Sequence, residues 1–326
     1  MTLRQELGQV SWFIKEQFTP SVLRKRIRTW RGVRLPRLPR RTTAPGSVWA
    51  VTMVKDEADI LGATLDHLLS QGVDHVIVSD NLSSDDTPQI IARYAARSDG
   101  RVHAATDAEP AYFQAEKMSR LVHAAWRAGA DWVIPFDADE FWFAEGQTLR
   151  EYLAGLSGRS PEVGVVDARF HHMVPTQPHP ADLTGAEFIL DATPVKPGKV
   201  AVRAHRLATV SVGNHGASRV GVRAGGLHIA HAVYRGPEQV ARKVRQGAAA
   251  VMLTRPGDEI ARHWRAGSAL GDAAVQEVWA NISAGRPDER LNYRAFGPMV
   301  RLRPLTWSSW DPDGLIPTGI EPRVFQ

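Results

Sequence analysis

The feature that most constrains the fold is a regular alternation of short apolar runs and amphipathic segments between residues 47 and 137. The apolar runs have the length and continuous hydrophobicity of strands that are buried on both faces. Strands are expected at residues 48–54, 75–79, 101–105 and 132–136, with helical faces between them at 61–69, 90–95 and 118–125. This order predicts an α/β fold with right-handed crossovers and a mostly parallel sheet flanked by helices.

After residue 164 the pattern changes to short apolar strands separated by loops rich in glycine, proline and histidine. Strands are expected at 163–170, 200–206, 208–212 and 226–230, followed by helices over 237–253, 259–264 and 273–282. We therefore expect an antiparallel and helical second half. The predicted regions are an N-terminal arm and linker at 1–46, one main domain at 47–297 and a tail at 298–326.

The predicted arm differs from the rest of the chain in charge. Of the 40 Lys/Arg and 35 Asp/Glu residues, 11 and two fall in residues 1–46, which leaves 29 basic and 33 acidic residues elsewhere. Apolar residues recur in the arm near helical spacing: Leu3, Leu7, Val10, Ile14 and Phe18. A basic amphipathic helix can lie on an anionic membrane surface. The alternative is a helix that packs on its own domain or on a second copy, and residues 34–45 predict an extended linker.

Composition excludes several classes of protein. The absence of cysteine excludes a disulfide scaffold, a thiolate zinc site, an iron–sulfur cluster and a cysteine nucleophile. No apolar run approaches the roughly 20 residues of a spanning helix, and no apolar signal core is visible. A cytoplasmic location is expected, with peripheral contact at the inner membrane face through residues 1–45. No nucleic-acid partner is expected, because only the arm is basic.

Polar side chains stand where three of the expected parallel strands end. Residues 55–57 follow the first strand, Asp80 ends the second, and Asp137 and Asp139 follow the fourth. Ligands bind beyond the carboxyl ends of such strands, so these residues predict one site. Two carboxylates one residue apart can hold Mg²⁺ or Mn²⁺, which would neutralise a diphosphate leaving group. Asp80 can accept a hydrogen bond from a nucleoside, or cap the next helix through an Asx turn.

Three segments resemble motifs of family-2-type glycosyltransferases. Residues 51–58 resemble the K-N-E opening, with Asp56 in place of the usual Asn. Residues 76–87 resemble the D-N-x-S-x-D-x-T segment that follows the second strand, and residues 137–141 resemble the metal-binding D-x-D-E-F.

Two further segments resemble the branch related to glycosyltransferase family 92. Residues 231–247 resemble its H-x-x-x-R-S-x-E-Q…K…G block, with Gly236 in place of Ser, and residues 213–215 resemble a shorter motif. The resemblance covers about residues 47–255.

This resemblance implies a GT-A fold and a metal-dependent glycosyltransferase. The enzyme would transfer a sugar from a nucleotide-diphospho-sugar, with a UDP-sugar expected, to a glycan or lipid-linked acceptor with inversion. Carried over by position, Lys55, Glu57 and Asp80 would line the nucleoside. Asp137 and Asp139 would hold Mn²⁺ or Mg²⁺.

Two basic side chains are weaker candidates for the same site. Lys117 can reach the diphosphate or lie on a solvated helix face. His231 falls on the histidine of the family block and is the predicted third metal ligand, with His215 second, whereas His228 should point elsewhere. The alternative for His231 is a buried histidine that bonds to the backbone. Histidines 171, 172 and 179 match no standard zinc spacing.

An inverting transfer also needs a base that removes the acceptor's hydroxyl proton. Glu187 is the first candidate and Asp182 the second, because both lie in a loop that could fold over an acceptor. Either can instead be an ordinary surface acid.

Two other functions compete with glycosyl transfer. A nucleotidyltransferase uses a similar sheet and acidic pair but requires a Gly-rich loop after the first strand, which residues 54–57 lack. A non-catalytic protein that binds a sugar nucleotide or a glycan would not require the intact pair Asp137 and Asp139.

Overall fold

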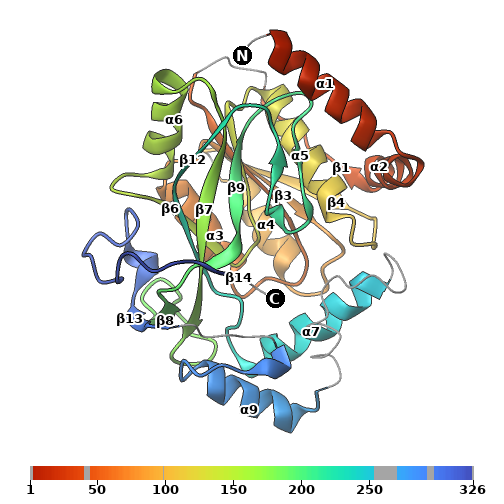
Figure 1. Ribbon diagram of the computed structural model, residues 1–326. Helices are drawn as coiled ribbons and strands as arrows, with labels where there is room; N and C mark the ends of the chain where they lie inside the picture. Colours follow the sequence, from red (N-terminus) through yellow and green to blue (C-terminus); the bar gives the residue numbers. More distant parts are fainter. Residues whose placement is uncertain (1–2, 40–44, 98, 253–269, 292–296, 325–326) are drawn as a thin grey trace.

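A computed structural model describes residues 3–39, 45–97, 99–252, 270–291 and 297–324. Figure 1 shows a central twisted sheet with helices packed on it, α1 and α2 beside one end, and α7 and α9 beneath. Strand order along the main sheet is β1-β4-β3-β2-β5-β9-β7-β12-β6. The mixed α/β architecture predicted from the alternating pattern is confirmed.

The first half of the sheet is parallel because a helix connects each strand to the next. Its strands are β2 (Val48–Val54), β3 (His75–Asp80), β4 (Val102–Asp107) and β5 (Trp132–Pro135), joined by α3 (Leu61–Ser70), α4 (Thr87–Ala95) and α5 (Gln114–Ala128). The pairs β4·β3, β3·β2 and β2·β5 are all parallel. The carboxyl ends of β2 and β5 therefore lie side by side.

The continuous apolar run in β2 reflects burial on both faces. Val48 and Ala50 pack in one hydrophobic core, and Trp49 and Val51 pack in a second core on the opposite face. Helix α5 ends as predicted at Gly129, whose φ of 109° is left-handed. Glycine adopts this conformation without the strain that a Cβ would impose.

The second half of the sheet is mixed. Its strands are β6 (Glu140–Ala144), β7 (Val163–Pro175), β8 (Phe188–Asp191), β9 (Val195–Arg203) and β12 (Val222–His231). The pairs β5·β9, β9·β7 and β12·β6 are antiparallel, whereas β7·β12 is parallel. The other elements are α6 (Leu149–Arg159), β10 (Thr209–Val210), η1 (Val212–Asn214), β11 (Ala217–Ser218), α7 (Pro237–Met252), α9 (Asp272–Ile282) and η2 (Glu289–Leu291). The helix predicted at 259–264 lies outside the described residues.

The C-terminal segment adds β13 (Met299–Leu302), η3 (Pro304–Thr306) and β14 (Arg323–Val324). Strand β13 pairs with β8, and β14 pairs with β9. The domain boundaries at residues 46 and 297 stay predictions.

The N-terminal segment forms α1 (Leu3–Gln17), α2 (Pro20–Gly32) and β1 (Val33–Arg34), which pairs with β4. The amphipathic helix predicted from residue 3 is thus present. Helix α1 contacts the body through the buried side chain of Gln9 and through Glu6, whose carboxylate pairs with His205 and Arg206. The Gln9 amide group bonds with the backbone of Ser218 and Val220. None of the helices in the described part of the chain combines the length and hydrophobicity that a bilayer-spanning segment requires.

Candidate active site

A cavity of about 300 Å³ opens beyond the carboxyl ends of β2 and β5. Its walls come from the β2 end, the start of α5, the turn between β5 and β6, the end of β12, and α7. Its charged lining residues are Lys55, Asp56, Glu57, Asp137, Asp139, Arg242 and Lys243, and its other polar ones include Asn81, Tyr112, Gln114, His231 and Gln239. The sequence predicted a ligand site at this edge of the sheet.

The buried carboxylate of Asp139 lies between the His231 imidazole and the Lys243 ammonium group. Its Oδ1 lies 3.3 Å from His231 Nε2, and its Oδ2 accepts a hydrogen bond from Lys243 Nζ. The antiparallel pair β6·β12 aligns Glu140 with His231, which brings the imidazole beside Asp139. Burial by itself raises the pKa of Asp139, but the charges of Lys243 and His231 bring that pKa well below its usual range. Asp139 is therefore an anion whose charge is neutralised locally.

Asp137 has a comparable set of partners. Its Oδ2 lies 2.8 Å from Lys199 Nζ, and its Oδ1 accepts hydrogen bonds from Asn214 Nδ2 at 3.2 Å and Gln114 Nε2 at 3.4 Å. The buried Lys199 ammonium also lies 2.8 Å from Glu140 Oε1. Burial lowers the pKa of Lys199, and the two carboxylates raise it above its usual value. Lys199 thus stays charged inside the protein.

Arg235 organises the opposite wall of the site. Its buried guanidinium donates to Glu57 Oε2 at 2.6 Å, to Asp59 Oδ2 at 2.7 Å and to the Ala232 carbonyl at 3.0 Å. Lys243 Nζ is 4.0 Å from Glu57 Oε1. The fixed fork of donors orients both carboxylates. Glu57, predicted to contact the nucleoside, lines the cavity while one of its oxygens is held by Arg235.

The loop after β2 is fastened to the loop after β3. Asp56 has a φ of 53°, a conformation that Asp and Asn adopt more readily than most residues. Its Oδ1 accepts hydrogen bonds from the backbone of Ser84 at 2.5 Å and Asp85 at 3.2 Å. In return, the Asp56 and Glu57 backbone N–H groups donate to Ser83 Oγ and Thr87 Oγ1. The polar motif at residues 76–87 therefore shapes the loop that carries Lys55 and Glu57.

Lys55 and Asp80 lie differently relative to the cavity. Lys55 is exposed and lines it, whereas the neighbour of Asp80, Asn81, reaches the lining. Asp80 Oδ1 is buried and has no hydrogen-bond partner in the described part of the chain. Its Oδ2 accepts a long bond of 3.4 Å from the Ser83 N–H. Because Oδ1 is buried and Asp80 does not line the cavity, the contact between Asp80 and a nucleoside stays a prediction.

Lys117 is a buried side chain with its own partners. Its ammonium lies 2.7 Å from Asp107 Oδ2 and donates to the Glu109 carbonyl at 2.6 Å. It is absent from the cavity lining. The proposed contact between Lys117 and a diphosphate stays a prediction, and the structure gives this side chain a role in joining α5 to the end of β4.

The two predicted bases also lie away from the cavity lining. Glu187 precedes β8, and its Oε2 pairs with Arg301 Nη1 at 3.1 Å. Asp182 is exposed and accepts a bond from the Thr184 N–H at 2.9 Å. Neither carboxylate is within the group that surrounds Asp137 and Asp139, so the identity of the base stays a prediction.

The three candidate histidines occupy separate environments. His231 lines the cavity, and its Nδ1 lies 3.1 Å from His172 Nδ1. His215 is exposed, and its Nδ1 bonds with the Gly198 carbonyl at 2.7 Å. His228 lies three residues before His231 but contacts Glu145 Oε1 at 2.8 Å and stacks on the Trp310 ring.

Several residues of the site received no role from the sequence. Arg235 and Lys243 stand in the block at residues 231–247, and their types signal anion contacts. Lys199 has no local signal, because its partners Asp137 and Glu140 are 62 and 59 positions away in the chain and are brought close only by the sheet.

Part of the chain matches a known protein family. Residues 49–181 match the sequence model of glycosyl transferase family 2. No curated protein gives a significant match. This segment carries β2 to β5, the loop at Lys55–Glu57, and both Asp137 and Asp139.

Three similar solved structures illustrate how far the likeness extends. The mannosyltransferase PcManGT from Pyrobaculum calidifontis, in complex with GDP-Man and Mn²⁺, is 17% identical, with 86% of this chain and 92% of that chain covered and a TM-score of 0.40. S. aureus TarS 1–349 is 13% identical, with 72% and 69% covered and a TM-score of 0.37. Glucosyl-3-phosphoglycerate synthase from Mycobacterium tuberculosis, with Mn²⁺, UDP and phosphoglyceric acid, is 18% identical, with 38% and 43% covered and a TM-score of 0.29.

Because the TM-scores of these structures are below 0.5, we assign no role to any residue of the site from them. The family match covers β2, β5 and the loops after them, which build part of the cavity, whereas the end of β12 and α7 lie outside the matched residues. The match of residues 49–181 to glycosyl transferase family 2 indicates that the protein is a glycosyltransferase.

Proposed function

We propose that this protein is a metal-dependent, inverting glycosyltransferase that uses a nucleotide-diphospho-sugar. A UDP-sugar is the expected donor, and a glycan or a lipid-linked molecule is the expected acceptor. The observation that carries the proposal is the cavity in which Asp137 and Asp139 face cationic side chains within a family 2 segment. The GT-A branch related to family 92 stays a resemblance.

The charges along the cavity suit a nucleoside diphosphate. Lys55, Arg242 and Lys243 line it and supply positive charge for an anionic diphosphate. Asp80, whose unpartnered Oδ1 is buried outside the cavity lining, would accept a hydrogen bond from the nucleoside only after the end of β3 moves. Lys55 and Glu57 stand on the loop that follows β2, and both line the cavity.

The donor set also fits a divalent metal in its chemistry. Two carboxylates and one imidazole suit Mn²⁺ or Mg²⁺, with the imidazole favouring Mn²⁺. As folded, the described residues contain no group of three or more His, Asp or Glu side chains poised as a metal site. Lys199 and Lys243 neutralise the carboxylates instead. Asp137, Asp139 and His231 would hold the ion after Lys243 releases Asp139, and the bound ion would supply charge neutralisation to the leaving diphosphate.

The side chains of the protein have defined tasks in this proposal. Arg235 holds Glu57 and Asp59, Lys199 holds Asp137, and His172 contacts the far side of the His231 ring. These contacts limit the motion of the groups that face the donor, and fixed charges stabilise a developing leaving-group charge better than mobile ones. Proton removal from the acceptor is left to the predicted bases, Glu187 and then Asp182.

A binding and turnover experiment tests the proposal. Wild-type protein is heated with UDP, GDP and their sugar conjugates, with and without Mn²⁺, and release of free nucleotide is measured with acceptor mixtures. A ligand that binds the folded state raises its Tm by mass action. Asp139→Asn should abolish the Mn²⁺-dependent rise and the turnover, whereas His228→Ala should preserve both.

Three results would contradict the proposal. One is that no nucleotide diphosphate stabilises the protein. A second is that Asp139→Asn turns over normally with the metal chelated. A third is release of pyrophosphate from a nucleoside triphosphate and a sugar phosphate, which would indicate a nucleotidyltransferase.

A further inference from the structure

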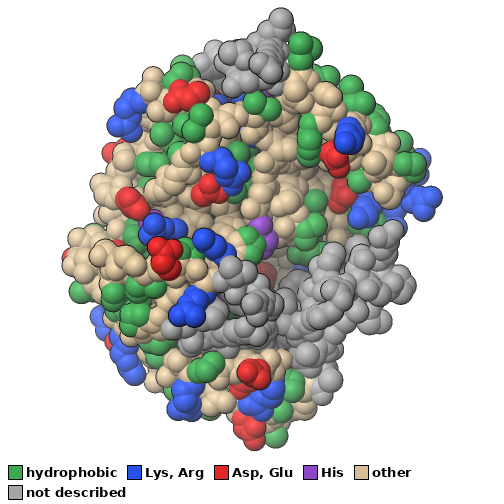
Figure 2. Space-filling model, viewed as in Figure 1, with side chains coloured by type: hydrophobic (Ala, Val, Ile, Leu, Met, Phe, Trp, Pro, Cys, Tyr) green, Lys and Arg blue, Asp and Glu red, His purple; other side chains and the backbone are tan. Residues whose placement is uncertain are grey.

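Helices α1 and α2 expose large apolar side chains. Trp30 is 68% exposed and Leu7 is 61% exposed, and no other described part of the chain covers them. The exposed set on the two helices is Leu7, Trp12, Ile14, Phe18, Leu23, Ile27 and Trp30. Figure 2 shows hydrophobic and basic side chains together over this region at the upper right. Contiguous apolar patches of this kind mark interaction surfaces.

The apolar stripe of α1 is not the face that packs on the protein. The buried residues of α1 are Gln9 and Phe13. Leu7, Ile14 and Phe18, which belong to the stripe predicted from the sequence, are exposed. Packing on the body of the protein therefore leaves the stripe available to a partner.

Helix α2 (Pro20–Gly32) sets apolar and cationic rows side by side. Leu23, Ile27 and Trp30 recur at i, i+4 and i+7, which places them on one face. One position further along, Arg24, Arg28 and Arg31 repeat the same spacing. The helix contains no acidic residue. An apolar face bordered by arginines is typical of a helix that lies in the interface of an anionic membrane.

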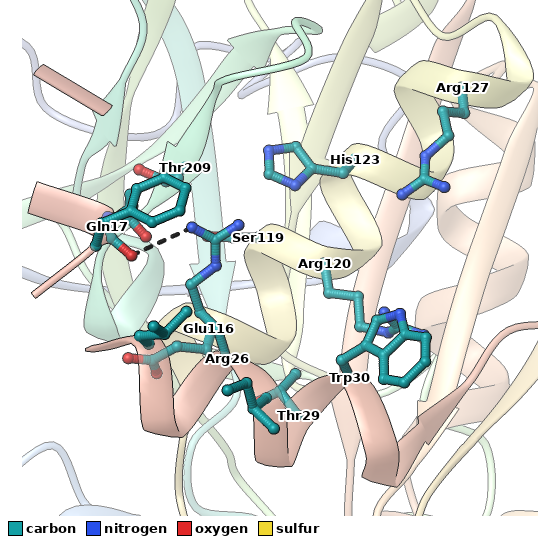
Figure 3. Close-up of a pocket in the computed structure, with 13 residues that line it drawn as sticks. Gln17, Arg26, Thr29, Trp30, Glu116, Ser119, Arg120, His123, Arg127 and Thr209 are labelled. Carbon is teal, nitrogen blue, oxygen red and sulfur yellow. Dashed lines mark hydrogen bonds between the residues drawn. The ribbon is translucent and has the colours of Figure 1, made fainter. Parts of the chain in front are cut away.

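A pocket of about 320 Å³ lies between α2 and α5 beneath this surface. Its lining includes Arg26, Arg120 and Arg127, with Trp30 and Ile27 on the α2 side and Glu116 as its acidic member. Figure 3 shows Arg120, His123 and Arg127 along α5, with Arg120 beside Trp30 of α2 and with the Arg26 guanidinium turned toward Gln17. Arg26 Nη1 donates to the Gln17 carbonyl at 3.3 Å and Arg120 Nη2 donates to the Val33 carbonyl at 3.0 Å, while Arg120 Nε is buried with no hydrogen-bond partner among the described residues. Guanidinium groups so placed suit a phosphate.

We propose that α1 and α2 form a docking surface for a membrane of anionic phospholipid. Trp30, Ile27 and Leu23 enter the boundary between headgroups and acyl chains, and Arg24 and Arg31 contact headgroups beside them. The arginine pocket between α2 and α5 receives a lipid phosphate. This inference goes beyond the proposed function, because it involves none of the residues that line the candidate active site.

Vesicle co-sedimentation of the full chain tests the inference. The probes are vesicles of phosphatidylcholine alone and of phosphatidylcholine with phosphatidylglycerol in a two-to-one ratio, at low and high salt. Wild-type protein should sediment with the anionic vesicles and be released by salt. Arg24→Gln/Arg31→Gln should weaken binding by roughly 20-fold. Arg93→Gln/Arg97→Gln changes two exposed arginines, one on α4 and one just after its end, removes the same net charge and should change binding by less than about threefold.

Two further variants separate the parts of the surface. Ile27→Asn/Trp30→Ala should reduce binding to anionic vesicles at low salt although its net charge is unchanged, because it removes apolar contact. Arg120→Gln/Arg127→Gln should reduce binding to anionic vesicles, and inorganic phosphate should not displace wild-type protein from them. Circular dichroism and Tm measurements show whether each variant is folded.

Several outcomes would overturn the inference. One is equal binding to neutral and anionic vesicles, and another is an equal loss for the α4 control variant. Displacement by inorganic phosphate would indicate a site for a free anion. A dimer in sedimentation velocity that dissociates in Ile27→Asn/Trp30→Ala would assign the surface to a second copy of this chain.

Discussion

Replacing Lys199 by Met should strongly destabilise the protein. The Lys199 ammonium is 4% exposed and lies 2.8 Å from both Asp137 Oδ2 and Glu140 Oε1. Glu140 is fully buried, and burial raises its pKa to about 8, against the lowering effect of Lys199. A methionine of similar length fills the space but removes the cation beside Asp137 and the ammonium group that favours the ionised form of Glu140.

The size of the effect follows from the burial of the pair. Breaking a buried ion pair by removal of one partner costs about 3–5 kcal/mol, because the remaining charge is left in a medium that solvates it poorly. That is a large part of the 5–15 kcal/mol by which a typical domain is stable. Glu140 avoids part of this cost by taking up a proton, because its pKa is already near 8. The double variant Lys199→Met/Glu140→Gln should therefore recover at most about 1 kcal/mol of the loss.

Urea unfolding followed by tryptophan fluorescence and circular dichroism measures these free energies. Lys196→Met is the matched control, because Lys196 stands on the same strand β9 (Val195–Arg203) and is exposed. It should change the unfolding free energy by less than about 0.5 kcal/mol. A loss of less than about 1 kcal/mol for Lys199→Met, or a double variant less stable than the single one, would refute the role of Lys199 as a buried counter-ion.

Three other predictions concern the site and the core. His231→Ala should weaken Mn²⁺-dependent nucleotide binding, measured by calorimetry, far more than metal-free binding, whereas His228→Ala should affect neither. Equal losses of binding with and without metal would show that His231 only shapes the cavity. Burial lowers the pKa of His67 to about 4. The unfolded state therefore binds more protons than the folded state between about pH 4 and 6.5. As the pH drops through that range, the free energy of unfolding should fall by up to about 1.4 kcal/mol per pH unit. Urea titrations should show a shallower slope for His67→Gln, and an unchanged slope would show that His67 is protonated in the folded state. Gly198→Ala places a Cβ 2.3 Å from the Ala168 carbonyl oxygen and should lower Tm in calorimetry, since the strand pair β7·β9 must move apart; an unchanged Tm would contradict this close approach.

The local pattern of the sequence was enough to predict the first half of the fold. Runs such as residues 48–54 are apolar on both faces, and that property belongs to each strand itself. The turn at Gly129 and the acids after β5 are also encoded locally. Because parallel strands share one carboxyl edge, the rule that ligands bind there led from sequence to the cavity that holds Asp137 and Asp139.

The tertiary structure decided which side chains meet across the chain. Lys199, Arg235 and Lys243 contact carboxylates that are 60 or more positions away in most pairs, and no local period reports such contacts. The parallel pairing of β7 with β12 was likewise absent from the pattern, because strand spacing does not specify the order of strands in a sheet.

Which face of α1 packs on the protein was also not predictable from the sequence alone. Helical spacing predicted a stripe through Leu7, Ile14 and Phe18, but spacing alone does not say whether a stripe faces the body or solvent. The ion pairs of Glu6 and the hydrogen bonds of Gln9 orient α1 on the protein, and Leu7, Ile14 and Phe18 consequently point outward. Sequence periodicity determines which residues share a face, whereas the partner of that face depends on contacts between segments far apart in the chain.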